Sequence, residues 1–517
     1  MRLFPNPKHV SRRGDSVLCG PGSGIHTLLA CSLQLALALF VLLSLAHLAV
    51  YVAARIPRID EIGYGDSYVL FDTLRSARTG TIYPDLSDPP YLPAQYGPWL
   101  YLLHSWPAGI SPSWNPFLGP RLLSVLSFFF CLFFVYRTAC SLWKNRMVAI
   151  WSVTLAASCA VVADWVLQLR SDFFAVSCSF FAIWLLLKGK RWAIVLAGVL
   201  AASAIVFKLT MAAAVGAGFL WLLSRKRFRE CLIFTASSAA FLLACYLWFA
   251  RTEPRMIQQL LAASPPVIDY SHYWELIISR VLREPVLWLA LTAIPFAYLG
   301  RRVSLLAIFA GISLLIALLT DFQAGGNVNY FFEFLFALAP LAGWAAVTLA
   351  RAARRQPALS LFAAGVFLIG PVFPVAKAVV EQAREFASIR KYNRPVELSQ
   401  QFLQGKRFFS TVPRLALMSP SPQLMEPWTL SIWRIQGKTD ASPWTVPVER
   451  GDYEVVVTSE VNAGWRGVRL IDGRLLRAIQ SRYLPYCRLG GYWYHLPAAG
   501  GTDTLKASLN RLGCRPL

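Results

Sequence analysis

Long apolar blocks separated by short polar connections make up the first three quarters of the chain. Eleven such blocks lie at 27–54, 118–140, 147–165, 173–188, 192–207, 209–224, 230–250, 285–300, 303–320, 331–350 and 357–378. A helix needs about 20 apolar residues to cross a bilayer core of about 30 Å. The pattern therefore predicts an all-α polytopic membrane protein with about 11 transmembrane helices, in which the two blocks that flank Lys208 are at the short end of this range.

The connections between these blocks alternate in charge. Basic connections occur at 188–191, 225–229, 301–302 and 351–355, whereas residues 55–90 carry six acidic side chains. Basic loops stay in the cytoplasm during insertion, so we expect a cytoplasmic N-terminus and an outer location for the segment after residue 378. The same placement explains the net charge of +23 without a nucleic-acid partner.

Three regions follow from this topology. They are a cytoplasmic arm at 1–26, a membrane domain at 27–378 with its first outer loop at 55–117, and an outer domain at 379–517. In the first outer loop, apolar residues at helical spacing from Tyr68 to Ala77 predict a surface helix that Gly80 ends.

The tail changes from long apolar blocks to short strand-like and helical runs. Strand-like runs lie at 407–412, 415–419, 452–459 and 490–497, and helical runs lie at 424–437 and 473–484. Their alternation predicts a small extracytoplasmic α/β domain. Cys487 and Cys514 are its two cysteines, and an oxidising compartment would permit a disulfide between them.

Four charged residues stand inside or at the ends of apolar blocks: Arg170, Asp172, Lys208 and Glu333. Each costs about 2.5–3.5 kcal/mol to insert, which makes each a functional candidate. The topology places all four near the outer face. Two structural alternatives remain open, namely a structural group formed by Arg170 and Asp172 with Asp164, and a Lys208 side chain that extends outward to the headgroups.

Acidic loop residues beside cations at a membrane surface fit one kind of chemistry. A carboxylate can take the proton of an acceptor hydroxyl while Arg and Lys stabilise a departing phosphate. A donor sugar on a lipid phosphate would explain why such an enzyme sits in a bilayer.

The stretches GDSYVLFDTLRSARTGTIYPD (65–85) and YGPWLYLL (96–103) resemble the first outer loop of the GT-C superfamily of integral membrane glycosyltransferases, which includes protein O-mannosyltransferases and aminoarabinose transferases. Asp66 and Gly80 match the family's spacing of an acidic residue and a glycine. The segments RSDFF (170–174), FKLT (207–210) and NVNYFFEF (327–334) resemble later family elements. The chain departs from the family in having Asp-Ser at 66–67, with an Asp-Glu pair earlier, at 60–61.

The resemblance implies an inverting transfer from a polyprenyl-phosphate sugar, with Asp66, or failing that Asp60, as the base. Arg170 and Lys208 would hold the donor phosphate. The implied pocket residues are Glu61, Asp88, Tyr96, Asp172, Asn329, Tyr330 and Glu333. For Asn329 and Tyr330, a simple helix cap is an alternative.

A membrane transporter or lipid-linked-glycan flippase is the main alternative function, because intramembrane charges also mark transport pathways. It predicts internal repeats, which the sequence lacks. The acceptor (a lipid, a glycan or a protein) stays open, as does a divalent metal. The absence of any Asn-x-Ser/Thr site favours a bacterial inner membrane.

Overall fold

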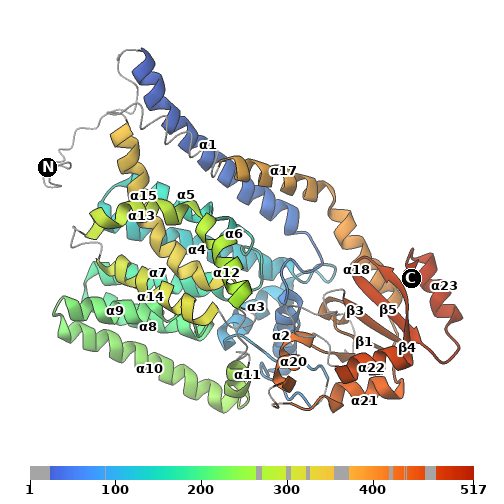
Figure 1. The fold of residues 1–517 in the computed structure, drawn as a ribbon. Coiled ribbons are helices and arrows are strands. Elements are labelled where there is room, and N and C mark those ends of the chain that lie inside the picture. Colours follow the sequence, from blue (N-terminus) through green and yellow to red (C-terminus); the bar gives the residue numbers. More distant parts are fainter. Residues whose placement is uncertain are drawn as a thin grey trace.

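The computed structural model describes the chain except for residues 1–23, 88, 263–269, 299–303, 322–325, 354–371, 418–422, 436, 438 and 460–472. A bundle of apolar helices forms one part, and a mixed α/β domain at the C-terminal end forms the other (Figure 1). Helices α2 (Asp66–Thr79) and α3 (Pro98–Ile110) of the first outer loop lie between the two parts.

The first ten apolar blocks coincide with helices of the bundle. These are α1 (Gly24–Arg55), α4 (Leu118–Trp143), α5 (Arg146–Ala157), α7 (Asp172–Lys188), α8 (Arg191–Phe207), α9 (Ala213–Ser224), α10 (Phe228–Thr252), α13 (Pro285–Tyr298), α14 (Ser304–Asp321) and α15 (Phe332–Ala353). The third block is interrupted after Ala157 and continues as the short α6 (Ala160–Ala163). The eleventh block falls mostly outside the described residues, and its end begins α17 (Phe373–Ala387).

The predicted helical membrane protein is confirmed at the level of its architecture. Four described helices are long and apolar enough to cross a membrane, within α1, α4, α10 and the segment Val328–Arg351. Several others, such as α8 and α9, are apolar but shorter. The number of eleven spans therefore stays a prediction.

Small residues bring the bundle helices into close contact. In α8, a Cβ added to Gly198 would overlap atoms of Phe234 and Ser237 in α10. In α15, a Cβ at Gly343 would overlap Val148 and Ser152 of α5. Such close approach is how helices associate in lipid, where burial of apolar side chains gives little driving force.

The outer segments support one another. As predicted, α2 ends at Gly80, which adopts a left-handed conformation with φ of 73°. After α10, the carboxylate of Glu253 accepts hydrogen bonds from the backbone amides of Ile82 and Tyr83, at 2.8 and 3.0 Å. Three short elements follow it: α11 (Met256–Ala262), α12 (Tyr270–Ser279) and the 3-10 helix η2 (Val281–Arg283).

The C-terminal domain contains a six-stranded sheet of order β2-β1-β3-β5-β4-β6. Its strands are β1 (Phe408–Ser410), β2 (Gln423–Leu424), β3 (Val455–Ser459), β4 (Tyr483–Leu489), β5 (Tyr492–Pro497) and β6 (Arg515–Pro516). Its helices are α18 (Ile389–Leu403), α19 (Pro413–Ala416), α20 (Pro427–Ile435), α21 (Ser442–Arg450), α22 (Gly473–Arg482) and α23 (Asp503–Arg511). Strand β1 pairs in parallel with β2 and β3, and the remaining pairs are antiparallel.

The predicted α/β character of the tail is confirmed, with one error. The run 415–419 is not a strand over its described residues, because Leu415 and Ala416 belong to α19. Pro413 favours this helix, since its fixed φ suits the first helical position. The predicted domain boundary at 378 falls inside α17.

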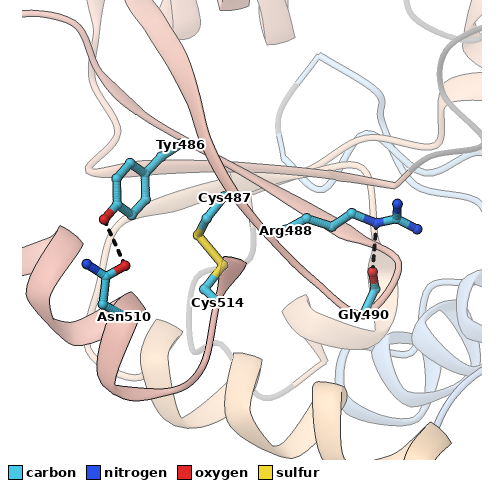
Figure 2. The surroundings of a disulfide bond; sticks show 6 residues. All are labelled: Tyr486, Cys487, Arg488, Gly490, Asn510 and Cys514. Atoms are coloured by element: carbon cyan, nitrogen blue, oxygen red, sulfur yellow. Dashed lines mark hydrogen bonds between the residues drawn. A yellow bond between two sulfur atoms is a disulfide. The ribbon is translucent and has the colours of Figure 1, made fainter. Parts of the chain in front are cut away.

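Cys487 of β4 and Cys514 form a disulfide across 27 residues of sequence (Figure 2). It ties the chain after α23 to the sheet. A disulfide fits an oxidising compartment, which agrees with the predicted outer location of this domain.

Candidate active site

A pocket lies beside α2, between the first outer loop and the start of α7. It encloses about 310 Å³ of space, including its open mouth. The lining residues are Tyr64, Gly65, Tyr68, Val69, Asp72, Pro93, Gln95, Tyr96, Tyr101 and Arg170. Gly65, Tyr68, Val69 and Asp72 recur at helical spacing, so one face of α2 forms a wall.

Asp66 is fully buried at the first position of α2. Its Oδ1 accepts a hydrogen bond from the amide of Leu169 and its Oδ2 from that of Gly63, both at 3.1 Å. Burial raises the pKa of Asp66, while the charges of Arg170 and Arg121 act in the opposite direction. Asp66 does not itself line the pocket, but its neighbour Gly65 and the nearby Arg170 do.

Arg170 is held over the pocket by π contacts and by one backbone bond. Its guanidinium carbon lies 5.3 Å from the ring centroid of Tyr96 and 5.5 Å from that of Trp165. Its Nη2 donates to the carbonyl of Tyr64. Gly65 has φ of +94°, and a Cβ there would stand 3.2 Å from the same Nη2, so glycine suits this position on two grounds.

Asp72 is buried and faces the pocket from the next turns of α2. Burial raises its pKa to about 7, against the effect of Arg75, which forms an ion pair with it at 2.7 Å. A carboxyl group that titrates near neutral pH is suited to proton transfer. We name Asp66, Asp72 and Arg170, with the pocket they adjoin, the outer cluster.

Asp60 has architectural partners instead. Its carboxylate pairs with Arg58 at 2.6 Å, and Arg58 pairs in turn with Glu385 of α17 at 2.6 Å. The buried Arg121 donates to the backbone carbonyl of Asp60 at 2.7 Å. These bonds join the end of α1 to α17 and α4, so Asp60 is well placed to hold the loop.

Glu61 is partly buried and is not among the residues that line the pocket. Burial raises its pKa to about 7, and the nearby Ser67 side chain opposes the shift. Tyr96 does line the pocket. Asp88 lies outside the described residues.

A second group, the membrane-edge cluster, consists of Asp172, Lys208, Asn329, Tyr330 and Glu333. Lys208 Nζ lies 2.7 Å from Asp172 Oδ1, and Asn329 Nδ2 donates to the same oxygen at 3.0 Å. Lys208 Nζ also stands 4.3 Å from the ring centroid of Tyr330. Glu333 is buried and accepts a 2.5 Å hydrogen bond from the hydroxyl of Ser179.

The contacts of this cluster differ from the structural alternatives that the sequence left open. Asp164 pairs with Arg280 at 3.7 Å, and Asp172 pairs with Lys208. The Lys208 side chain is only 10% exposed, so it does not extend outward. The 3-10 helix η3 (Val328–Phe331) before α15 is capped by Asn327, whose side chain accepts from the Val328 amide, and Asn329 is not the cap.

Stacked aromatic rings position the ion pair of Asp172 and Lys208. Phe173 stacks on Phe332 with centroids 5.4 Å apart, and Phe174 stacks on Phe207 at the same distance. These rings are chain neighbours of Asp172, Glu333 and Lys208. The starts of α7 and α15 and the end of α8 are therefore fixed against one another.

The two clusters adjoin through residues 170–172. Gly97, beside the pocket-lining Tyr96, packs so closely on α8 that a Cβ would overlap the carbonyl oxygen of Val206. Several buried polar atoms in this region lack a partner among the described residues: Arg170 Nε, Ser171 Oγ, Asp172 Oδ2, Thr210 Oγ1 and Asn329 Oδ1. Buried polar groups are usually paired, so their concentration here is a sign of a ligand or water site.

Sequence reasoning missed several pocket residues. Asp72, Tyr64 and Tyr68 carried a usable signal, because they follow one another at a spacing of four residues, which places them on one face of a helix. Glu426 of the C-terminal domain also reaches this region, where Tyr64 donates to it at 2.7 Å. No local pattern marks Glu426. Within the described residues, no group of three or more His, Cys, Asp or Glu is arranged to hold a metal.

Several solved structures superpose on most of this chain. ArnT from Cupriavidus metallidurans in the apo state superposes with a TM-score of 0.58 and 13% identity, over 89% of this chain and 97% of that one. The Archaeoglobus fulgidus oligosaccharyltransferase in the apo form gives 0.53 and 11% identity, over 90% and 74%. The same archaeal enzyme, AglB, with an inhibitory peptide and a dolichol-phosphate gives 0.53 and 12%, over 92% and 77%.

The chain has the GT-C fold. The resemblance inferred from the sequence motifs is therefore confirmed for the fold. No family model matches the chain, and no curated protein matches its sequence. At 11–13% identity the GT-C likeness establishes architecture alone, and the activity has to be argued from the residues of the site.

Proposed function

We propose that the protein is a membrane glycosyltransferase that moves a sugar from a polyprenyl-phosphate donor to a hydroxyl acceptor on the outer face of a bacterial inner membrane. The observation that carries this proposal is the adjacency of the two clusters. One offers buried carboxylates beside a pocket, and the other offers a buried lysine at the membrane edge. Donors without partners among the described residues lie where the two clusters meet, on Arg170, Ser171 and Thr210. The GT-C fold supports the same class of activity.

The donor phosphate is assigned to the junction of the clusters. Lys208 has three N–H donors and uses one on Asp172. Arg170 Nε, Ser171 Oγ and Thr210 Oγ1 are further buried donors without partners in the described part of the chain. Together they can stabilise the charge that develops on a leaving phosphate, while the lipid tail stays among the apolar helices.

Asp66 is assigned as the general base and Asp72 as an acceptor-side carboxylate. A base takes the proton from the acceptor hydroxyl as its oxygen bonds to the anomeric carbon, and the bond from that carbon to the phosphate oxygen breaks. The configuration inverts, and the lipid phosphate leaves with the bond electrons. Backbone amides hold Asp66 in place, and Asp60 is committed to Arg58.

The test is to incubate the purified protein in detergent with undecaprenyl-phosphate-linked pentoses and hexoses, with and without added Mg²⁺ or Mn²⁺. We expect release of undecaprenyl phosphate from at least one donor, measured by mass spectrometry, and an inverted anomeric product by NMR. Movement of intact sugar lipid across vesicles without any release would instead support the flippase alternative.

A further inference from the structure

A strip of the C-terminal domain, made of residues 411–417 and 423–429, lies against the pocket side of the first outer loop. Tyr91 forms a parallel bridge with Met425, beside β2. The Tyr91 amide donates to Leu424 at 2.8 Å, and the Glu426 amide donates to the Tyr91 carbonyl at 3.1 Å. The first outer loop therefore joins the edge of the sheet in the C-terminal domain through a single β-bridge.

The same strip holds three side chains that line the pocket. The hydroxyl of Tyr64 donates to Glu426 Oε1 at 2.7 Å. The hydroxyl of Tyr68 donates to the Thr411 carbonyl at 3.0 Å, and Gln95 Nε2 donates to Thr429 Oγ1 at 2.5 Å. The shape of the pocket therefore depends on a domain that is remote in sequence.

Glu426 makes the charged contact of this set. It is 1% exposed, and its Oε2 accepts from the Thr429 amide at 2.5 Å, which fixes the carboxylate on its own strip. A hydrogen bond to an ionised acceptor is about twice as strong as a neutral one. The bond to Tyr64 is thus a strong link between the domain and the loop.

Tyr64 is the point at which this link meets the outer cluster. Its ring lines the pocket, and its carbonyl accepts from Arg170. It stands between Gly63, whose amide binds Asp66, and Gly65, which packs on Arg170. Because Tyr64 is 46% exposed, burial alone does not hold its ring in place.

We propose that Glu426 is a positioning residue for the acceptor: through the Tyr64 hydroxyl it holds the wall of the pocket against which the acceptor binds. This proposal rests on the proposed glycosyltransferase function. It assigns to the C-terminal domain a part in acceptor binding, and it leaves the donor phosphate at the junction of the two clusters.

The experiment compares Glu426→Gln, Tyr64→Phe and the double variant with the wild-type protein. Tyr486→Phe is the matched control, because the Tyr486 hydroxyl donates to Asn510 at 2.8 Å in the same domain, beside the disulfide (Figure 2). Undecaprenyl-phosphate sugar is the donor, and a dilution series of an envelope lipid and glycan extract supplies the acceptor. Donor hydrolysis by water is measured without extract.

We expect each single variant to need about ten times more extract for half-maximal transfer, as loss of a charge-assisted bond predicts. Donor hydrolysis should stay unchanged, and the double variant should resemble the singles because both remove one bond. Deuterium uptake over residues 62–70 should rise in both singles and not in Tyr486→Phe.

Unchanged acceptor dependence with unchanged deuterium uptake would overturn the role of Glu426 alone. Additive losses in the double variant, or a loss confined to donor hydrolysis, would also overturn it. Absence of donor release by the wild-type protein would refute the proposed function, and the acceptor role with it.

Discussion

The outer cluster and the membrane-edge cluster use the same residue types in opposite ways. In the outer cluster, backbone amides hold the Asp66 carboxylate, and Arg170 donates to a carbonyl. In the membrane-edge cluster, Lys208 binds Asp172 directly. A direct pair neutralises both charges, as burial near lipid demands. Backbone amides hold Asp66 and a cation holds Asp172, and this difference suggests separate roles for the two carboxylates, although Asp72 of the outer cluster also pairs directly, with Arg75 at 2.7 Å.

Their surroundings differ as well. Stacked phenylalanine rings on α7, α8 and α15 fix the membrane-edge cluster. The outer cluster depends on hydrogen bonds from the first outer loop and from the C-terminal domain. We therefore expect substitutions in the membrane-edge cluster to affect mainly folding and donor binding, and those in the outer cluster to affect mainly catalysis and acceptor binding.

Asp66→Asn should produce the largest effect. Loss of a general base lowers the rate of sugar transfer about 10²- to 10⁴-fold. The assay follows transfer from undecaprenyl-phosphate sugar. An unchanged elution profile in gel filtration would show that the variant is still folded. Asp60→Asn is the matched control and should keep most of the activity. If Asp60→Asn were inactive and Asp66→Asn active, the base assignment would be reversed.

Lys208→Met tests the paired charge. Removing the lysine leaves Asp172 buried without its cation, which costs about 3–5 kcal/mol in unfolding free energy. Lys208→Met/Asp172→Asn should recover most of that stability without recovering donor affinity. Arg394→Met is the control, since its surface pair with Glu397 at 3.7 Å is worth about 1 kcal/mol or less. Recovery of donor binding in the double variant would contradict a phosphate role for Lys208.

Glu61→Gln should produce the smallest effect, and that effect should depend on pH. Because the pKa of Glu61 rises from 4.5 to about 7 on folding, the folded state binds the proton more tightly, and its stability falls as pH rises between these values. Gln lacks this penalty. We expect Glu61→Gln and the wild-type protein to be equally stable at pH 4.5, and the variant to be more stable by about 1–2 kcal/mol at pH 8. Thermal unfolding at the two pH values measures this difference. Glu397→Gln, at an exposed position, is the control.

The sequence located most of the bundle helices and part of the C-terminal domain, but it did not predict how these elements contact one another. Apolar block length located the bundle helices, and spacing located α2 and its end at Gly80, because both signals are local. The family resemblance placed Asp66 ahead of Asp60 as a candidate base, and the pairing of Asp60 with Arg58 could not be read from the sequence. The pairing of Lys208 with Asp172 and the approach of Glu426 to Tyr64 depend on tertiary packing between distant segments, which no local pattern encodes.

The single β-bridge between Tyr91 and Met425 has a consequence for protein engineering. A chimaera that carries the C-terminal domain of another protein of the same fold would lose the backbone hydrogen bonds of this bridge unless the first outer loop were exchanged as well. Loop and tail therefore form one transplantable unit, although more than 300 residues of sequence separate them.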